Sequence, residues 1–420
     1  MMDFFLHIEN TKENKIKEVK IMKKKLVVIA NFTRLPWENG NSRFPYIINL
    51  IDKEKFDVEL ITSRFFHVEK RHRKDSAFAD NLDYKITLIN EPGYKKNVSI
   101  KRFLSHKIFA KNVKKYLETI EKPDVIYCAI PSLDVAKVAG DFANKNNIKF
   151  IIDIQDLWPE AFEMVFKVPI LKDIIFYPMR KKADKIYEMA DSIIAVSETY
   201  ADRAGRVNKK YKHKLGIFLG TDLEYFDKSH YEHEIITFDN VFRVAYIGTL
   251  GNSYDIKCVI DALKILKDKG INNILFEVMG SGPLKIEFEK YAKEKGVNCE
   301  FTGRLNYEEM TGYLCICDMA VNPIKAGSAA SIINKVGDYA AAGLPVINTQ
   351  ESIEYRKLVE DYEIGYNVEN ENSEELAEAI EYLYKNEDLR KRLGVNNRKL
   401  AEEKFDRKIT YLKIKEVIEE

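Results

Sequence analysis

Residues 331–343 read SIINKVGDYAAAG and run directly into LPVI (344–347). The pattern predicts a short helix, a glycine that ends it and a buried strand. Ser331, Lys335 and Asp338 have the i, i+4, i+7 spacing that places side chains on one helix face. A cation and a carboxylate on such a face could meet a phosphate and a sugar hydroxyl, the two groups of a nucleotide-sugar. The alternative is a surface helix with a solvated Lys335 and Asp338, and this segment alone favours it.

Composition sets the broad class of the protein. The chain has 420 residues, of which 45% are hydrophobic, enough for two domains with real cores. Its 67 Lys and Arg residues balance 66 Asp and Glu residues, and a net charge of +1 gives no general attraction to nucleic acid. No apolar run approaches the roughly 20 residues that span a bilayer. The five cysteines are scattered without a second ligand pair, so we expect a reduced, cytoplasmic protein without a zinc site.

Short apolar segments alternate with helical patterns along most of the chain, which predicts parallel sheets covered by helices. Residues 1–21 are polar and lack the apolar core of a secretory signal, so we expect an N-terminal extension. The alternation restarts at Phe242–Gly248, after the polar and irregular stretch Phe226–Phe238. We therefore expect a first Rossmann-like domain over 22–228, with the helix 406–420 packing back on it, and a second over 229–405. Two such domains that face each other leave a cleft at the carboxyl ends of their strands.

The expected elements follow from short apolar segments and from helical apolar faces. After a first strand within Met22–Ala30, the strands expected are Val58–Thr62, Lys85–Asn90, Asp124–Ile130, Phe150–Ile154, Ser192–Ser197, Leu215–Leu219, Phe276–Met279, Cys299–Phe301, Met319–Val321 and Pro345–Asn348. The clearest helices are Ile100–Ile120, Leu133–Asn144 and one that Asp255 caps.

Three turns that follow strands carry glycine, which lets a ligand approach the backbone. GTLG (248–251) and GSGP (280–283) lie in the second half, and NGNSR (39–43) opens a helix in the first. A helix N-terminus at such a turn attracts phosphate. The alternative is an ordinary βα turn, which is the preferred interpretation for GSGP. The glycine triplet of dinucleotide-binding proteins is missing, which disfavours an oxidoreductase. The turn residues assigned to a donor site are Gly40, Asn41, Gly248, Thr249, Gly280 and Gly282.

A dense polar and aromatic turn, DIQDLWPE (153–160), follows another expected strand. Asp156 would lie near the carboxyl end of that strand, where a carboxylate can orient an acceptor hydroxyl or assist removal of its proton. The alternative is that Asp156 caps a helix while Trp158 packs in the core.

The segment Tyr94–Leu117 holds eight basic residues and no acidic one. Its apolar residues can share one helix face and its lysines another, which is typical of a protein that lies on an anionic membrane surface. The alternative is a domain helix with solvated lysines. A second basic cluster, 70–74, adds to the first. The apolar face would comprise Ile100, Phe103, Leu104, Ile108, Val113 and Leu117, and the membrane-facing side Lys101, Lys107, Lys111, Lys114 and Lys115.

These motifs, in this order, resemble the family 4 retaining glycosyltransferases, which have the GT-B fold of two facing Rossmann-like domains. The resemblance covers nearly the whole chain after Met22. DLWPE together with the helix motif looks like the branch that builds bacterial capsule, O-antigen and exopolysaccharide. The stretches that carry it are YIGTL (246–250), GSGP (280–283), FTGRLNYEEM (301–310), CDMAVNP (317–323), NKVGDYAAAGLPVI (334–347), DLWPE (156–160) and ADSIIAVSE (190–198).

The resemblance implies transfer of a hexosyl or N-acetylhexosaminyl group from a nucleotide-sugar to a polyprenyl-linked or saccharide acceptor, with retention and without a metal or other cofactor. Asp338 would contact the donor ribose, and Ser331 would also lie at the donor. Lys335 and Arg304 would hold the diphosphate, with Lys335 offsetting the charge on it as it departs. Asp156 would position the acceptor. Such an enzyme is expected to be cytoplasmic and peripheral at the inner face of the cell membrane.

The chain departs from the family pattern at three positions. The family usually has an acidic residue where this chain has Ala330, and often has Arg and Lys near the positions of Thr249 and Tyr254. These departures motivate an alternative of another class, a catalytically silent GT-B subunit that binds or scaffolds within a polysaccharide assembly complex.

Overall fold

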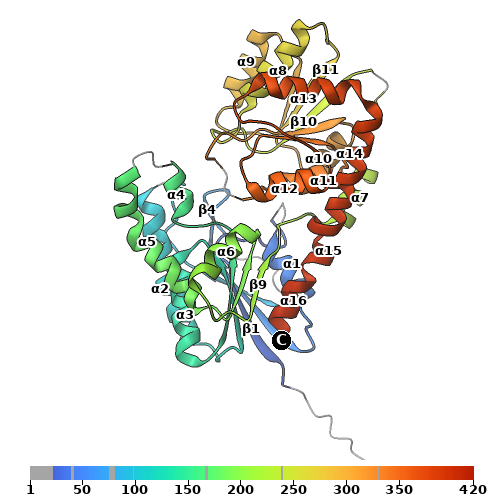
Figure 1. Cartoon of the computed structure of the whole chain (residues 1–420). Coiled ribbons are helices and arrows are strands. Elements are labelled where there is room, and N and C mark those ends of the chain that lie inside the picture. The colour runs from blue at the N-terminus through green and yellow to red at the C-terminus, as the bar shows by residue number, and fades with distance from the viewer. Residues whose placement is uncertain are drawn as a thin grey trace, which may run out of the picture.

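The computed structural model describes residues 22–38, 42–74, 81–97, 99–165, 169–237, 240–328 and 331–420. It shows two α/β domains, one above the other in Figure 1, each built on a sheet of parallel strands. The first sheet has seven strands in the order β5-β2-β1-β6-β7-β8-β9. The second has six in the order β12-β11-β10-β13-β14-β15. The first strand of each domain, β1 or β10, lies in the interior of its sheet. Later strands are added on both sides of it, and the helices that connect them cover the faces of the sheet.

The first domain forms because its strands are apolar on both faces. Val28 of β1 is fully buried and stands in register with Leu60 of β2 and Tyr127 of β6. The strands are β1 (Lys24–Ile29), β2 (Phe56–Ser63), β5 (Lys85–Ile89), β6 (Val125–Ile130), β7 (Lys149–Ile154), β8 (Ser192–Ala195) and β9 (His213–Gly216), with a small separate pair, β3 (Phe65–Phe66) and β4 (Arg71–His72). The helices are α1 (Arg43–Leu50), α2 (Ile100–Leu117), α3 (Leu133–Asn146), α4 (Glu160–Val165), α5 (Pro169–Met189) and α6 (Glu198–Val207).

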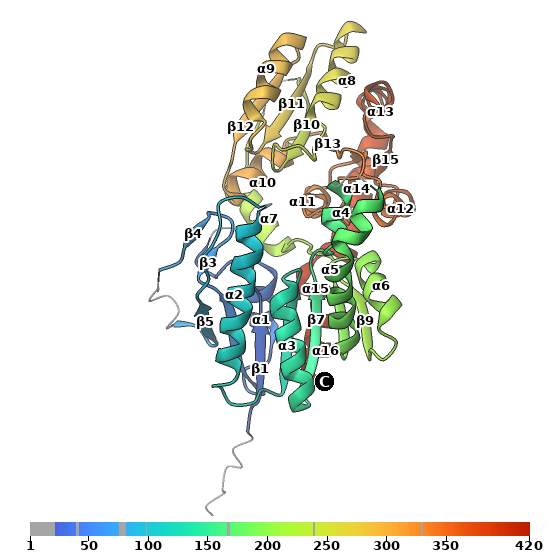
Figure 2. The same cartoon turned by 90° about the vertical axis from the view of Figure 1, so that its left-hand side faces the viewer.

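Helices cover both faces of the first sheet. Figure 2 shows α2, α3 and α5 side by side on one face, where Phe109 and Val113 of α2 pack into the same core as Val27 and Ile29. The opposite face packs against α1 and against the last helix of the chain, α16 (Leu412–Glu419).

The second domain repeats the plan. Its strands are β10 (Phe242–Ile247), β11 (Ile274–Met279), β12 (Cys299–Gly303), β13 (Met319–Asn322), β14 (Val346–Asn348) and β15 (Gly365–Asn367). Its helices are α7 (Leu223–Glu232), α8 (Ile256–Asp268), α9 (Lys285–Lys295), α10 (Tyr307–Cys315), α11 (Lys335–Ala341), α12 (Ile353–Asp361), α13 (Ser373–Lys385) and α14 (Glu387–Leu400), followed by a π-helical turn at Ala401–Phe405. Asp255 caps α8 by accepting a hydrogen bond from the Cys258 amide, as the sequence predicts.

The chain passes between the domains twice, and the two crossings lie side by side. The Thr221 amide donates to the Phe405 carbonyl at 2.8 Å, and the Arg407 amide donates to the Thr221 carbonyl at 3.1 Å. The Arg407 guanidinium binds the carbonyls of Leu219 and Gly220. After this point α15 (Arg407–Thr410) and α16 run along the first domain, where Ile414 and Ile418 are buried.

The structure differs from the sequence expectation in several elements. The helix expected from Ser331 begins only at Lys335, so Ser331 precedes the helix instead of sharing its face. Gly343 nevertheless follows its end with φ +63°, the left-handed backbone that glycine adopts freely. The stretch expected to be irregular contains most of α7, whose Phe226 is buried. The strand expected at Leu215–Leu219 is β9, which ends at Gly216, and β15 was not expected.

No helix in the described parts of the chain is long and apolar enough to cross a membrane.

Candidate functional site

Lys335 is the most unusual charged side chain of the second domain. It is 8% exposed at the start of α11, and its Nζ has no hydrogen-bond partner among the described residues. The ammonium group lies between two aromatic rings, 3.9 Å from the centroid of Tyr246 and 4.0 Å from that of Tyr254. Burial lowers the pKa of Lys335 well below its ordinary value. A buried amine without a counter-ion is costly unless a ligand supplies one.

Lys335 lies directly under the glycine turn between β10 and α8. A Cβ built on Gly248 would stand 2.9 Å from the Lys335 Nζ, so this glycine leaves the space into which the lysine reaches. Gly248 has φ +133°, a backbone that other residues rarely adopt. Thr249 next to it is exposed, and its carbonyl accepts a hydrogen bond from the Tyr246 hydroxyl at 2.8 Å. The structure thus brings together three residues that the sequence assigns to a donor site: Gly248, Thr249 and Lys335.

Gly280 and Gly282 support this turn from behind. A Cβ on Gly280 would lie 1.8 Å from the Gly248 carbonyl oxygen, and one on Gly282 would lie 2.2 Å from the Leu250 carbonyl oxygen. The two turns are also joined by hydrogen bonds from the Gly248 amide to Met279 and from the Leu250 amide to Ser281. Close packing of two backbones therefore explains both glycines, in line with the structural interpretation of GSGP. Direct contact of Gly280 or Gly282 with a donor stays a prediction.

We expect Gly280→Ala to lower the free energy of unfolding by at least about 2–3 kcal/mol, because the new methyl group would overlap a backbone carbonyl that cannot move aside. Gly251→Ala is the matched control, since in the same region its Cβ would meet only a Thr249 methyl group at 3.8 Å. Thermal denaturation of both variants measures the difference. Equal melting temperatures for the two would contradict the packing role.

Asp338 lies one turn after Lys335 and is held by two hydroxyl groups. Its Oδ1 accepts hydrogen bonds from Thr221 Oγ1 and from the Tyr307 hydroxyl, each at 3.0 Å. Burial raises the pKa of Asp338 to about 6, although both hydroxyls and the charge of Arg407 act in the opposite direction. Thr221 belongs to the first chain crossing. Asp338 therefore connects α11 to the junction of the two domains and keeps Oδ2 for another partner.

Polar groups of the first domain face this region. The Tyr200 hydroxyl, on α6, lies against both Asp156 and the Ser331 hydroxyl of the second domain. Asp156 accepts a hydrogen bond from Trp158 Nε1 at 3.3 Å, and burial raises its pKa. The alternative interpretation of this turn had Asp156 as a helix cap and Trp158 in the core. Trp158 is indeed a core residue, whereas no cap contact of Asp156 with α4 is described. Asp156 and Tyr200 thus lie opposite Ser331 of the second domain, whose buried hydroxyl has no hydrogen-bond partner among the described residues.

A second contact closes the same side of the interface. Glu354, in the first turn of α12, accepts hydrogen bonds from the Glu198 amide at 2.9 Å and from the Thr199 hydroxyl at 3.0 Å. These groups are the N-terminus of α6, which favours a carboxylate.

The remaining donor-site predictions are placed less closely. Arg304 is exposed in the turn after β12 and lies near Arg34, which follows β1 in the first domain; the like charge contributes to a lowered pKa of Arg34, after burial. The role of Arg304 on the diphosphate stays a prediction. Gly40, Asn41 and Ala330 lie outside the described residues.

Tyr254 accounts for one departure from the family pattern. The resemblance expects a cation near this position, and the structure instead places an aromatic ring there, against the Lys335 ammonium. The positive charge beside the glycine turn is therefore supplied from α11 rather than from the turn itself.

A basic and aromatic cluster at the carboxyl edge of the first sheet was missed from the sequence. The Arg102 guanidinium lies 4.7 Å from the Trp158 ring and 5.6 Å from the Tyr94 ring, and its Nε is buried without a hydrogen-bond partner among the described residues. His106, one turn later on α2, stacks on Trp158 and is 2% exposed. The four-residue spacing of Arg102 and His106, which places both on one face of α2, could have indicated this cluster.

The basic segment differs from expectation on its apolar side. All five lysines assigned to the membrane are exposed: Lys101, Lys107, Lys111, Lys114 and Lys115. Of the expected apolar face, Val113 and Leu117 are buried, whereas Ile100 and Leu104 are 87% and 56% exposed. Ser105, His106 and Phe109 take their place in the core, because the buried face of α2 is rotated relative to the expected one.

The second basic cluster is partly a structural element. Arg73 is 4% exposed and binds Glu38 through two hydrogen bonds of 2.7 Å. Its guanidinium also donates to the carbonyls of Ser63 and Thr33. The charge of Arg73 is therefore satisfied inside the domain and cannot serve a membrane.

Among the described residues, no group of three or more His, Cys, Asp or Glu side chains is arranged to hold a metal ion. The five cysteines are free thiols, and burial raises the pKa of Cys315 to about 12.

Comparison with known proteins identifies the fold and finds a family model that matches the second domain. Residues 230–400 match the family model described as glycosyl transferases group 1. Sucrose-phosphate synthase from Thermosynechococcus elongatus superposes with a TM-score of 0.69 at 16% identity, over 94% of this chain and 98% of that one. HepE from Anabaena, in a complex with UDP, superposes with a TM-score of 0.65 at 16% identity, over 94% of this chain and 99% of that one.

A curated relative is similar in sequence as well. O-antigen chain mannosyltransferase C from Escherichia coli is 25% identical over 228 residues, which are 53% of this chain and 58% of that protein. The aligned part therefore spans less than two thirds of that relative. The chain has the GT-B fold, and residues 230–400, which lie in its second domain, match the glycosyl transferases group 1 model.

Proposed function

We propose that this protein transfers a sugar from a nucleotide-sugar to a lipid-linked or saccharide acceptor, with retention at the anomeric carbon, in the synthesis of a bacterial surface polysaccharide. The observation that carries the proposal is the Lys335 ammonium at the start of α11. It is buried beneath the Gly248 turn without a counter-ion. The O-antigen relative supports the polysaccharide, and the UDP complex of HepE supports a nucleotide donor.

The donor is proposed to lie along the second domain. Its diphosphate would take the backbone amide of Thr249 and the charge of Lys335, while the ribose hydroxyls would donate to Asp338 Oδ2. These groups stabilise negative charge that grows on the diphosphate as the sugar leaves, so the proposal requires no metal or other cofactor. A desolvated ammonium is effective here because little water competes with it.

The acceptor is proposed to enter from the first domain. Asp156 and Tyr200 stand opposite Ser331 and would orient the acceptor hydroxyl toward the same face of the sugar that the diphosphate leaves. The departing phosphate oxygen would take the proton of that hydroxyl. Asp156 then positions the acceptor and forms no covalent bond to the sugar. Its place beside the Tyr200 hydroxyl suits a residue that binds hydroxyl groups.

A panel of nucleotide-sugars tests the proposal. We expect one of them to raise the melting temperature of the protein and to be hydrolysed slowly without acceptor, with and without EDTA. The alternative of a catalytically silent subunit, which the comparisons do not favour, predicts neither hydrolysis nor transfer with any donor. A product whose anomeric configuration is inverted, read by nuclear magnetic resonance, would contradict retention.

We also propose that the protein works at the inner face of the cell membrane. The exposed lysines of α2 stand beside the exposed Ile100 and Leu104, so this helix offers both charge and apolar surface to a bilayer. Basic residues near an anionic surface contribute about 1 kcal/mol each.

Replacing Lys107, Lys111, Lys114 and Lys115 by Gln should reduce co-sedimentation with vesicles of phosphatidylglycerol at least about tenfold, because up to four favourable charges are lost. Binding of the unmodified protein should also weaken with added salt, since attraction extends only about 8 Å at physiological ionic strength. A matched variant with Gln at Lys267, Lys269, Lys290 and Lys293 of the second domain is the control, and it should bind as the unmodified protein does. Equal vesicle binding by both variants would show that the α2 lysines are merely solvated.

A further inference from the structure

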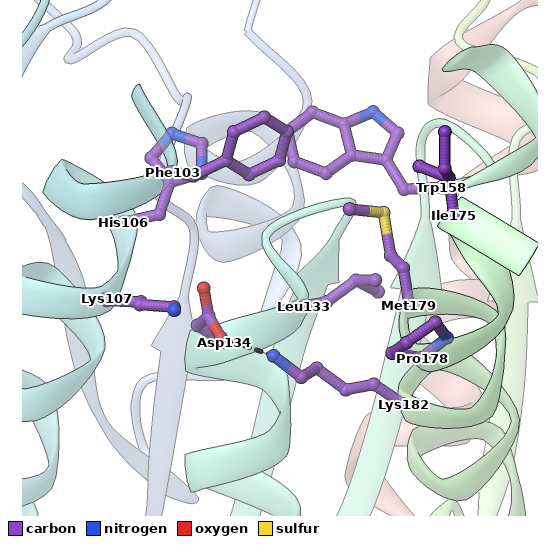
Figure 3. Close-up of a pocket in the computed structure, with 10 residues that line it drawn as sticks. All are labelled: Phe103, His106, Lys107, Leu133, Asp134, Trp158, Ile175, Pro178, Met179 and Lys182. Carbon is purple, nitrogen blue, oxygen red and sulfur yellow. Dashed lines mark hydrogen bonds and ion pairs between the residues drawn. The ribbon is translucent and has the colours of Figure 1, made fainter. Parts of the chain in front are cut away.

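A cavity of about 300 Å³ opens on the first domain, away from the donor residues (Figure 3). It lies between α2 and α5, above the first turn of α3. Its apolar walls are formed by Phe103, Leu133, Trp158 and Met179. The volume is at the lower end of the range for ligand pockets, about 300–1,000 Å³.

The polar groups of this cavity carry a net positive charge. Lys182 forms an ion pair with Asp134 at 2.7 Å, and Lys107 stands on the other side of that carboxylate (Figure 3). Lys107 forms no ion pair with a described carboxylate. Two ammonium groups against one carboxylate leave one positive charge, at the N-terminus of α3, which also favours an anion.

His106 supplies a second, independent sign of a ligand. It lines the cavity, is 2% exposed, and its Nε2 has no hydrogen-bond partner among the described residues. Its ring is stacked on Trp158 with an interplanar angle of 10°, so it cannot turn away to find one. Burial lowers the pKa of His106 to about 3, which keeps the ring neutral near pH 7. A buried nitrogen of this kind costs free energy until a ligand group pairs with it.

The cavity is continuous with an apolar surface. Ile175 lines it and is 47% exposed, and its neighbours Ile174 and Tyr177 on α5 are 69% and 53% exposed. Across the opening, the first turns of α2 expose Ile100 and Leu104. Exposed apolar side chains that gather around a pocket mark a contact with lipid or with an apolar ligand.

We propose that this cavity binds a lipid phosphate, with the chain next to the head group between Phe103, Trp158 and Met179 and the phosphate against Lys107, Lys182 and His106. The volume admits only the first part of a chain, so the rest would continue over Ile175 into the bilayer. The inference rests on the proposed function in one respect: it makes the lipid phosphate the anchor of the acceptor. Trp158 would then join the lipid site to Asp156, two residues earlier, which faces the donor.

Trp158 is itself the reporter for a test in the free protein. The chain has two tryptophans, so Trp37→Phe leaves Trp158 as the single source of indole emission. Titration with farnesyl monophosphate, below the concentration at which it forms micelles, should change this emission saturably. Farnesol and inorganic phosphate should each bind at least about tenfold more weakly, because each offers half of the recognised chemistry.

Two variants in the same background locate the site. Lys107→Glu should weaken binding of farnesyl monophosphate at least about tenfold, whereas Lys145→Glu, at the far end of α3, should leave it unchanged. Met179→Phe should also weaken binding by filling the cavity. No saturable change, or equal binding by Lys107→Glu, would overturn the proposal, as would phosphate or farnesol binding as tightly as the lipid phosphate. The thermal shift with nucleotide, measured on the same samples, reports separately on the donor site.

Discussion

A protein carrying Lys335→Met is expected to transfer sugar roughly 10²–10³-fold more slowly, because it would lose the buried charge that we propose to face the departing diphosphate. Methionine has nearly the length of lysine and can fill the space between Tyr246 and Tyr254. It also removes the free-energy cost of burying an ammonium group. The same cost is the reason that burial lowers the pKa of Lys335 so strongly. The variant should therefore be at least as stable as the unmodified protein, so a loss of transfer cannot be attributed to unfolding.

The pattern of lost affinity gives a sharper result than the rate alone. Lysine acts on phosphate as a point charge, so affinity for the nucleoside diphosphate should fall more than affinity for the monophosphate. Calorimetry with both ligands measures this, and Lys293→Met on α9, an exposed lysine of the same domain, is the control. Equal losses for the two ligands would place Lys335 away from the diphosphate. An unchanged rate of transfer would remove it from the reaction.

The second large effect is expected at Asp338. Asp338→Asn should lower the affinity for nucleotide roughly ten- to a hundredfold, since a charge-assisted hydrogen bond to a ribose hydroxyl contributes about 1.5–3 kcal/mol. The same change should stabilise the free protein. Asparagine keeps an oxygen for Thr221 and Tyr307 but carries no charge to bury.

The pH dependence follows from the raised pKa of Asp338. The unfolded chain loses this proton near pH 3.8 and the folded protein only near pH 6. Unfolding therefore releases a proton between these values, and the contribution of Asp338 to stability falls as the pH rises through that window. Above pH 6 the loss persists, at most about 1–3 kcal/mol, and Asp338→Asn should restore it.

Melting temperatures at pH 4 and pH 7.5 measure this directly. The Asn variant should gain over the unmodified protein at pH 7.5 and lose that advantage at pH 4. Nucleotide affinity of the unmodified protein should weaken as the pH falls below 6, because the neutral carboxyl is a poorer acceptor. A variant that is destabilised at pH 7.5, or one that binds nucleotide as tightly as before, would contradict the assignment.

The sequence indicated the two-domain fold because its apolar segments are long and regular. Buried strands such as β1 and β10 contain continuous apolar runs, Leu26–Ile29 and Val244–Ile247, and the glycine that follows α11 shows where the helix ends. The start of α11 could not be predicted in the same way. Ser331 has the spacing of a helical residue, but its carbonyl accepts a hydrogen bond from Gln350, which lies beyond β14. Contacts between distant segments override local pattern at such places.

The sequence predicted which residues belong to the candidate site better than it predicted which side chains contact them. Lys335 was expected beside a glycine turn, yet only the folded chain shows that Tyr246 and Tyr254 enclose it. The sequence places Arg73 in a basic cluster, as one more surface cation. In the structure it binds Glu38, which lies 35 residues earlier in the chain. The spacing of charges along a chain does not reveal which of them are neutralised by remote partners.

Because the crossings at Gly220 and Phe405 lie side by side, a rotation of one domain against the other would have its axis there. A rotation about that axis moves Asp338 least, because this residue is bonded to Thr221 on the axis itself. The ribose site proposed at Asp338 would therefore keep its shape during such a rotation. The contact of Glu354 with α6 lies away from the crossings in both views, so such a rotation would move it more than Asp338 (Figures 1 and 2). With the donor and acceptor placed as we propose, such a geometry would let the donor bind before the domains close and would leave closure to control access of the acceptor.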